Sequence, residues 1–284
     1  MQEICVIDVG EIEAAVCQAC IEACYRLPDD VSRALERAAL AEDRPEAREI
    51  FALLVQNAQV AAACDIALCQ DTGMAVVMLE IGQAVSLVGG DLTAAINRGV
   101  ARAYTEGYLR KSVVADPLDR VNTGDNTPAV IHVELVPGDG LTVRVMAKGF
   151  GSENMSGLAM LTPADGAAGV RRFVTELVRR AGGNPCPPLV VGVGLGGTME
   201  KAAALAKKAL FRPVGQPNPT PHLAQLERDL LADIQATGVG PAGLGGTITA
   251  LAVHVEAYAT HITSLPVAVN LNCHALRRAT RVIR

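Results

Sequence analysis

Residues 188–210 read PLVVGVGLGGTMEKAAALAKKAL, and this stretch decides the class of fold. Its first eight residues form an apolar run rich in valine, which predicts a buried strand over 188–195. The following TMEKAAALAKKAL is rich in helix-forming residues and carries lysines near its end, where the helix dipole favours cations. It therefore predicts a helix over 198–210. A strand followed by a helix is typical of proteins that mix α and β structure.

The same alternation extends outward along the chain in both directions. Apolar runs predict further strands, two of them joined by the turn PGDG, over 74–79, 129–136, 141–147 and 265–272. Helical periodicity predicts helices, including a basic helical tail at the end, over 11–26, 30–63, about 93–109, 165–180, 222–238 and 274–284. We expect one mixed α/β domain spanning 1–284, with helices packed around short sheets and a largely helical part at 1–65.

Composition excludes several classes of protein. Half of the residues are hydrophobic and only 19% are charged, which favours a large packed core over a disordered chain. Charged residues or glycines interrupt every apolar run before the roughly 18–20 residues that a membrane span needs. The first residues are acidic, unlike a secretory signal, and a net charge of −5 argues against a nucleic-acid groove. We expect a cytoplasmic protein without a nucleic-acid or membrane partner.

Three of the eight cysteines are close together in the sequence, at Cys17, Cys20 and Cys24. This spacing superficially suggests a metal site. On a helix, however, positions i, i+3 and i+7 form one stripe, and the neighbouring residues are small and apolar. Core packing is therefore the preferred interpretation of this group.

Three other cysteines lie where regular structure is expected to end. Cys69 precedes a turn, Cys186 stands among prolines that favour an extended, exposed loop, and Cys273 follows the last strand. Three thiolates can hold three irons of a [4Fe–4S] cluster and leave the fourth open to a substrate. Cysteines so far apart carry no signature in their spacing, so ordinary buried thiols remain an alternative at this point.

Five segments together resemble the α part of class I iron–sulfur fumarate hydratases and L(+)-tartrate dehydratases. They are CQDTG (69–73), AKGFGSENMS (147–156), NPCPP (184–188), GVGLGGTMEKAAALAKKAL (192–210) and GPAGLGGTITALAVHVE (240–256). The resemblance runs from about residue 30 to the end of the chain. It implies that Cys69, Cys186 and Cys273 ligate a [4Fe–4S] cluster, while the other five cysteines lie outside the motifs.

The resemblance also implies roles for five other residues. It places Gln70 and Asp71 at the substrate, with Asp71 supporting proton transfer, and gives Arg110 a carboxylate of the substrate to bind. Gly149 and Gly151 would bring backbone amides to the substrate. The residue types alone also allow an aspartate that caps a turn, a cation at a helix end and a plain glycine turn.

The reaction implied by the family is the reversible addition of water to a small dicarboxylic acid. The segment GSENMS looks more like the fumarate hydratases, which favours hydration of fumarate to (S)-malate, with L(+)-tartrate dehydratase as the alternative. In single-chain class I enzymes a second domain supplies the base, and this sequence ends soon after Cys273. We therefore expect a separate β subunit in a heteromer, α2β2, with activity only when both subunits are present.

Two other classes of function remain as alternatives. A non-catalytic zinc or iron–sulfur protein would need a fourth ligand, from Cys64 or a nearby histidine. The pattern Gly192-x-Gly194-x-x-Gly197 between a strand and a helix matches a dinucleotide-binding loop, but no acidic residue ends a strand about 20 residues later. Close packing of strand against helix is the preferred interpretation of these glycines.

Overall fold

A computed structural model describes residues 4–284, which divide into two compact units. The first unit comprises the residues up to Pro28, Ala58–Gly149 and Arg277–Arg284, and the second comprises Asp29–Asn57 and Phe150–Leu276. This is a finer division than the one domain over 1–284 that the sequence led us to expect. Both units combine helices with short sheets, so the predicted mixed α/β class is confirmed. Within 4–284, no helix is both long and apolar enough to span a membrane.

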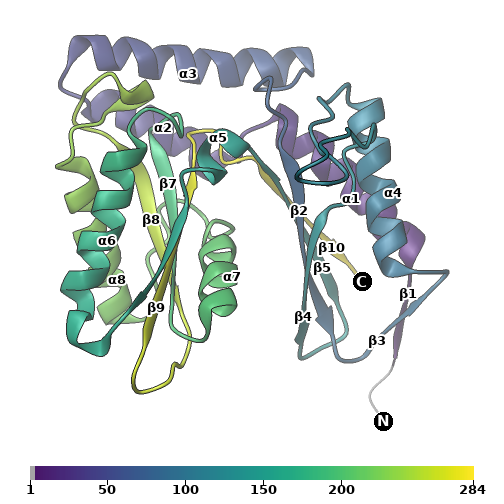
Figure 1. Cartoon of the computed structure of the whole chain (residues 1–284). Helices are drawn as coiled ribbons and strands as arrows, with labels where there is room; N and C mark the ends of the chain where they lie inside the picture. Colours follow the sequence, from purple (N-terminus) through teal and green to yellow (C-terminus); the bar gives the residue numbers. More distant parts are fainter. Residues whose placement is uncertain (1–3) are drawn as a thin grey trace. The chain divides into compact units, whose positions relative to one another are not determined.

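The first unit contains two sheets and two long helices (Figure 1). Its elements are β1 (Cys5–Asp8), α1 (Val9–Tyr25), β2 (Met74–Gly82), β3 (Val85–Val88), α4 (Leu92–Glu106), β4 (Val130–Val136), β5 (Leu141–Lys148) and β10 (Arg278–Ile283). Strands β1 and β3 pair in parallel, and the larger sheet has the order β10-β5-β2-β4. Helix α1 packs against α4 and against strands β5 and β10. The core therefore forms where α1 meets one face of the larger sheet.

Helix α1 explains the clustered cysteines. Cys17, Cys20 and Cys24 are at most 2% exposed and belong to the hydrophobic core between α1 and the sheet. The core interpretation of this group is thus confirmed. Helix α4 begins as its sequence suggests, because Asp91 Oδ1 accepts a hydrogen bond of 2.7 Å from the amide of Ala94.

One expectation for the first unit is wrong. Residues 278–283 are not helical but form strand β10, which pairs antiparallel with β5. The two strands on either side of the PGDG turn are not neighbours, because β2 lies between them, parallel to β4 and antiparallel to β5. The PGDG turn packs closely against Gly82 at the end of β2. A β-carbon on residue 82 would lie 2.5 Å from the carbonyl oxygen of Gly138.

The second unit is built on one four-stranded sheet in the order β6-β9-β7-β8. Its elements are α2 (Asp29–Ala41), α5 (Phe150–Glu153), β6 (Gly157–Leu161), a short 3-10 turn (Pro163–Asp165), α6 (Gly166–Ala181), β7 (Leu189–Leu195), α7 (Met199–Ala209), α8 (Pro221–Gln235), a second 3-10 turn (Pro241–Gly243), β8 (Ala250–Ala257) and β9 (Leu265–Asn272). Helix α3 (Pro45–Cys64) begins in this unit and ends in the first. Helix α7 covers one face of the sheet, and α6 and α8 cover the other (Figure 1).

The glycines of β7 are there for close packing. Val191 and Val193 point into the core under α6 and α8. Gly192 and Gly194, which alternate with these valines, face α7. A β-carbon on Gly192 would lie 2.1 Å from the carbonyl oxygen of Ala206 in that helix. On Gly194 a β-carbon would lie only 2.0 Å from the backbone of the same helix. The packing interpretation of this glycine pattern is therefore confirmed.

Candidate functional site

The segment Cys69–Gly73 connects helix α3 to strand β2 in the first unit. Asp71 Oδ1 accepts a hydrogen bond of 2.9 Å from the amide of Gly73, so the aspartate shapes the turn. Gly73 has a φ of +75°, and a β-carbon there would lie 2.6 Å from the carbonyl oxygen of Lys148. Only glycine suits both requirements. Gln70 is exposed, and its Oε1 lies 3.5 Å from Cys69 Sγ.

Buried polar groups anchor this turn to the rest of the unit. The hydroxyl of Tyr104 donates to the carbonyl oxygens of Thr72 and Gly73 at 2.8 and 3.0 Å. Burial raises the pKa of Tyr104 well above its usual value, so the phenol remains a donor. Thr72 Oγ1 donates to the carbonyl oxygen of Arg110 at 3.0 Å. Arg110 is exposed and lies beyond the end of α4, so its backbone, rather than a helix end, fixes its place beside the turn.

Two buried cations of the first unit, one of them bonded to the backbone of Asp71, have no signal in the sequence that singles them out. Arg277 is 2% exposed and donates from Nη1 to the carbonyl oxygen of Asp71. Lys148 is 1% exposed and donates to the carbonyl oxygen of Gly149 at 3.1 Å. A β-carbon on Gly149 would lie 2.9 Å from Arg277 Nη2 and 3.1 Å from Asp71 Oδ2. The predicted site residues Asp71 and Gly149 are thus brought together, with a guanidinium beside them.

In the second unit, Cys186 and Cys273 lie at the same edge of the sheet. Val190, near the start of β7, pairs with Asn272 at the end of β9, so the residues flanking these strands are neighbours. His274 joins the two loops directly, because its amide nitrogen lies 3.4 Å and its Nδ1 lies 3.2 Å from the carbonyl oxygen of Cys186. Cys186 is exposed, as expected, but its φ of +54° is left-handed and not extended.

The segment after Gly149 is also tied to this edge. Residues 150–153 form the short helix α5, whose Glu153 is paired with Lys207 of α7 at 2.6 Å. The side-chain amide of Asn270 donates to Glu153 Oε2 at 2.8 Å. Burial lowers the pKa of Lys207, and the carboxylate of Glu153 opposes that shift. A β-carbon on the exposed Gly151 would lie 3.5 Å from the carbonyl oxygen of Asn184, so Gly151 lies beside the Cys186 loop.

The cysteines differ in their suitability as ligands. Burial raises the pKa of Cys24 to about 11 and that of Cys20 well above its usual value, which disfavours thiolates in the core. Cys69, Cys186 and Cys273 lie on loops, at least partly exposed, and are thiols rather than halves of disulfides. Their donor chemistry fits an iron–sulfur cluster. Across residues 4–284, no group of three or more Cys, His, Asp and Glu side chains is arranged to hold a single metal ion.

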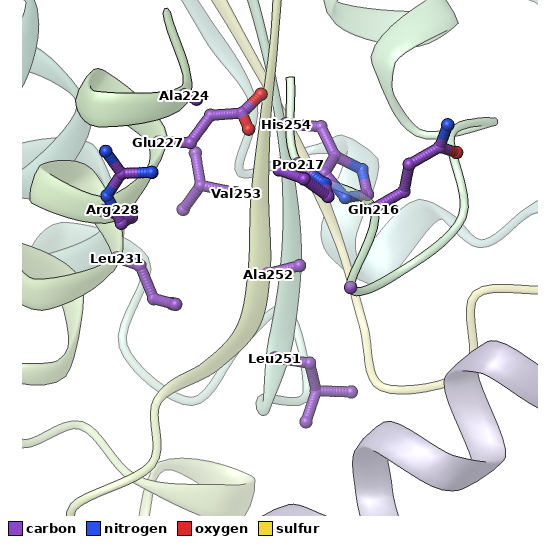
Figure 2. Close-up of a pocket in the computed structure, with 11 residues that line it drawn as sticks. Gln216, Pro217, Ala224, Glu227, Arg228, Leu231, Leu251, Ala252, Val253 and His254 are labelled. Carbon is purple, nitrogen blue, oxygen red and sulfur yellow. The ribbon is translucent and has the colours of Figure 1, made fainter. Parts of the chain in front are cut away.

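A pocket beside β8 in the second unit is a different feature (Figure 2). It is lined by Leu231, Leu251 and Val253 together with Glu227 and His254, among others. Of the site residues predicted from the sequence, none is part of the lining that the structure describes. The polar groups here serve the fold.

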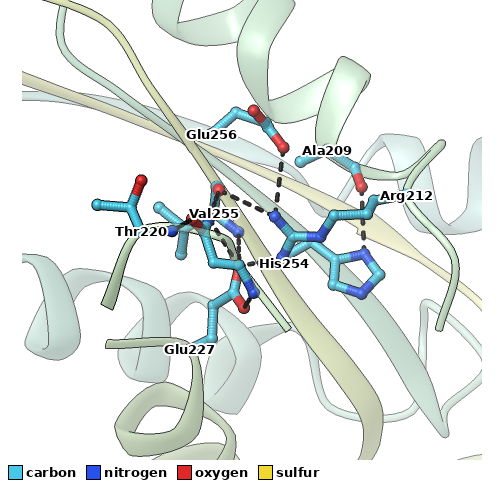
Figure 3. Close-up of polar contacts among 8 residues, drawn as sticks. Ala209, Arg212, Thr220, Glu227, His254, Val255 and Glu256 are labelled. Atoms are coloured by element: carbon cyan, nitrogen blue, oxygen red, sulfur yellow. Dashed lines mark hydrogen bonds and ion pairs between the residues drawn. The ribbon is translucent and has the colours of Figure 1, made fainter. Parts of the chain in front are cut away.

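Figure 3 shows how two of these polar groups are used. Glu227 pairs with Arg212, whose side chain is 10% exposed, and accepts a hydrogen bond of 2.7 Å from the amide of Val255. His254 Nδ1 lies 3.2 Å from the carbonyl oxygen of Ala209.

The chain matches one family model and is similar to several known proteins over most of its length. The family model described as Fumarate hydratase (Fumerase) matches residues 13–282. A protein of Methanocaldococcus jannaschii named "Putative L(+)-tartrate dehydratase subunit alpha" is 42% identical over 270 residues, covering 93% of this chain and 94% of the relative. The L(+)-tartrate dehydratase subunit alpha of Escherichia coli K12 is 34% identical, covering 91% of this chain and 86% of the relative.

Proposed function

Because the chain belongs to the fumarate hydratase (Fumerase) family of hydro-lyases, we propose that it is the α subunit of an L(+)-tartrate dehydratase. One observation carries the choice of substrate: relatives at 34–42% identity over nine-tenths of the chain bear that name. The sequence had favoured fumarate, and the relatives support the alternative better. Hydration of fumarate to (S)-malate is kept as the second candidate, because the family model is described by that activity.

The proposed cofactor is a [4Fe–4S] cluster with Cys69, Cys186 and Cys273 as its ligands. Three protein ligands leave one iron open, which can act as a Lewis acid toward a hydroxyl group. The support from the second unit is that Cys186 and Cys273 share one sheet edge. The support from the first unit is that Cys69 begins a turn whose carbonyls are fixed by Tyr104.

The turn residues are proposed to bind and orient the diacid. The exposed guanidinium of Arg110 can pair with a carboxylate through two parallel hydrogen bonds. Asp71 is held by Gly73 through Oδ1, while its Oδ2 faces Gly149, and it is proposed to support proton transfer. Gln70, Gly149 and Gly151 are also proposed to contact the substrate.

A separate β subunit is proposed to complete the enzyme in an α2β2 heteromer. The relatives' names include "subunit alpha", which supports a partner subunit. The base that removes the proton from carbon is proposed to come from that partner. The chain alone should therefore bind the cluster and turn over slowly.

The ligand assignment is tested by anaerobic reconstitution with iron and sulfide, followed by iron counts and EPR. We expect about four irons per chain, and a marked loss in the variants Cys69→Ser, Cys186→Ser and Cys273→Ser. Cys64→Ser is the matched control, because Cys64 is exposed and lies outside the motifs. Equal loss of iron in the control, or zinc in place of iron, would refute the assignment.

The choice of substrate is then tested by assaying the chain expressed together with its β subunit. The expected result is a higher kcat/KM for dehydration of L(+)-tartrate to oxaloacetate than for dehydration of (S)-malate to fumarate. The two substrates differ by one hydroxyl, which a few polar contacts can discriminate strongly. A preference for malate would favour the second candidate.

A further inference from the structure

Glu42 is a completely buried carboxylate that the proposed function does not use. It lies in the short connection between helices α2 and α3 and is 0% exposed. Its oxygens accept hydrogen bonds from three backbone amides: Thr247 at 2.9 and 3.0 Å, Ile248 at 3.0 Å and Arg44 at 3.1 Å. An ionised group this deep in a protein is stable only when such bonds replace water. Burial raises the pKa of Glu42, but the amide bonds outweigh it and hold the pKa below its usual value.

Two of these amides come from the end of the glycine-rich loop 240–248, which is 205 residues away in the sequence. Four of the nine residues of this loop are glycines and its leucine, Leu244, is exposed, so few side chains beyond the buried Pro241 anchor it in a core. Gly246 also packs closely on the carboxylate, since a β-carbon there would lie 2.9 Å from Glu42 Oε2. The carboxylate therefore fixes the backbone at the end of this loop.

The other side of this loop touches the loop that carries Cys186. The amide of Ala242 donates to the carbonyl oxygen of Pro187 at 2.8 Å. A β-carbon on Gly243 would lie 2.4 Å from the Cα of Gly183, so the two backbones are in direct contact. The amide of Cys186 in turn donates to the carbonyl oxygen of Gly183 at 3.0 Å. The Cys186 turn is thus held from both ends by the glycine-rich loop.

Cys186 needs such support because of its backbone conformation. A φ of +54° is unfavourable for any residue with a β-carbon and persists only where the surroundings impose it. We propose that Glu42 is a positioning residue for Cys186, acting through the glycine-rich loop to hold the thiol in the orientation required of a ligand. The inference rests on the proposed function in one respect, that Cys186 is a ligand. The contacts from Glu42 through the glycine-rich loop to the Cys186 turn do not depend on that role.

The experiment uses the full chain, reduced and free of metal, and measures hydrogen exchange by mass spectrometry. In Glu42→Gln, the side-chain amide cannot accept from all the backbone donors, so residues 182–189 and 240–248 should exchange about tenfold faster. In the same sample, alkylation of Cys186 by iodoacetamide should accelerate relative to the exposed Cys64, which serves as an internal reference.

Glu227→Gln is the matched control. Glu227 is also a buried carboxylate of the second unit that accepts from backbone amides, but it binds Val255 and Asn218 instead of the glycine-rich loop. The Glu227→Gln substitution should lower the free energy of unfolding without changing hydrogen exchange around Cys186 or the rate at which Cys186 is alkylated. Equal acceleration in both variants, or none in Glu42→Gln, would overturn the proposal.

Gly183→Ala provides a second variant in which Glu42 is intact. A β-carbon there would lie 3.0 Å from the carbonyl oxygen of Ala242, so the two loops must move apart by a few tenths of an ångström. The expected result is the same faster exchange of residues 182–189 while residues 247–248 keep their protection. If exchange around Cys186 does not change, the contact between the loops does not position the thiol. The iron counts of the serine variants test the ligand role separately, so the two proposals can fail independently.

Discussion

The substitution Gly194→Ala tests whether the glycines of β7 serve packing or a nucleotide. The added β-carbon would lie 2.0 Å from the carbonyl oxygen of Ala202 and 2.6 Å from the amide nitrogen of Ala206, both backbone atoms of α7. Real β-carbons essentially never come closer than 3.0 Å, so the helix must move away by at least 1.0 Å (3.0 − 2.0). Helix α7 packs on both β7 and β9, so the shift disturbs contacts with two strands.

The size of the effect follows from the cost of overpacking. Adding a methyl group to a well-packed core costs about 1–3 kcal/mol, and the upper end applies because backbone atoms block the site. For a chain of this size, each kcal/mol lowers Tm by about 2–4 °C. A loss of about 3 kcal/mol therefore predicts a fall in Tm of about 6–12 °C.

Thermal unfolding followed by circular dichroism, with guanidinium titration as a second measure, would give these numbers. Gly140→Ala is the control, because a β-carbon there would lie 3.9 Å from its nearest neighbour, the carbonyl oxygen of Ile283. It should change Tm by less than about 2 °C. If Gly194→Ala is as stable as the wild type, the packing argument is refuted. Saturable binding of NAD that this variant abolishes would restore the dinucleotide interpretation.

Three further predictions concern buried polar groups. Tyr104→Phe removes the phenol donor from the carbonyls of Thr72 and Gly73, of which Gly73 keeps the side-chain amide of Asn126 at 3.2 Å. It should lower the free energy of unfolding by about 1–3 kcal/mol, measured in guanidinium, and no loss would mean that the turn is held without the phenol. The lowered pKa of Glu42 means that its stabilisation is complete above about pH 4.3, its unfolded value, and is lost as the pH falls through the folded pKa. The stability difference between wild type and Glu42→Gln should thus shrink on going from pH 7 to pH 3.5, and a constant difference would contradict it. Arg212→Met leaves Glu227 buried without its cation and should cost about 3–5 kcal/mol by the same titration, whereas a neutral result would show that the backbone amides suffice.

The sequence predicted the elements whose signals are local. Strand β7 and helix α7 are found close to where residues 188–210 placed them, since a valine-rich run and a lysine-ended helix need no distant partner to be recognised. Strand β10 was missed because Arg278–Ile283 alternates only weakly and its arginines suggest a helix end. Pairing with β5 decided its conformation. The position of β2 between β4 and β5 likewise depends on contacts across the sheet, which a turn sequence does not reveal.

The candidate site residues also differ in whether their signal is local in the sequence or depends on distant contacts. Residues in short motifs, such as Asp71 and Cys186, stand out because turn-forming neighbours surround them. In the sequence Arg277 is only the first of two arginines soon after Cys273, in a segment whose composition predicts a basic helical tail. Its burial beside Asp71 comes from a contact that spans 206 residues of sequence.

Glu42 in the second unit and Arg277 in the first hold loops in a similar way. Each is a buried charge that binds backbone groups of a loop more than 200 residues away. Arg277 binds the turn that carries Asp71, and Glu42 binds the glycine-rich loop that touches the Cys186 turn. A backbone held by an ion tolerates little displacement, because any shift leaves the charge without its hydrogen bonds in a medium of low dielectric constant. Ligands and acid–base groups need such fixed positions more than the rest of the fold does.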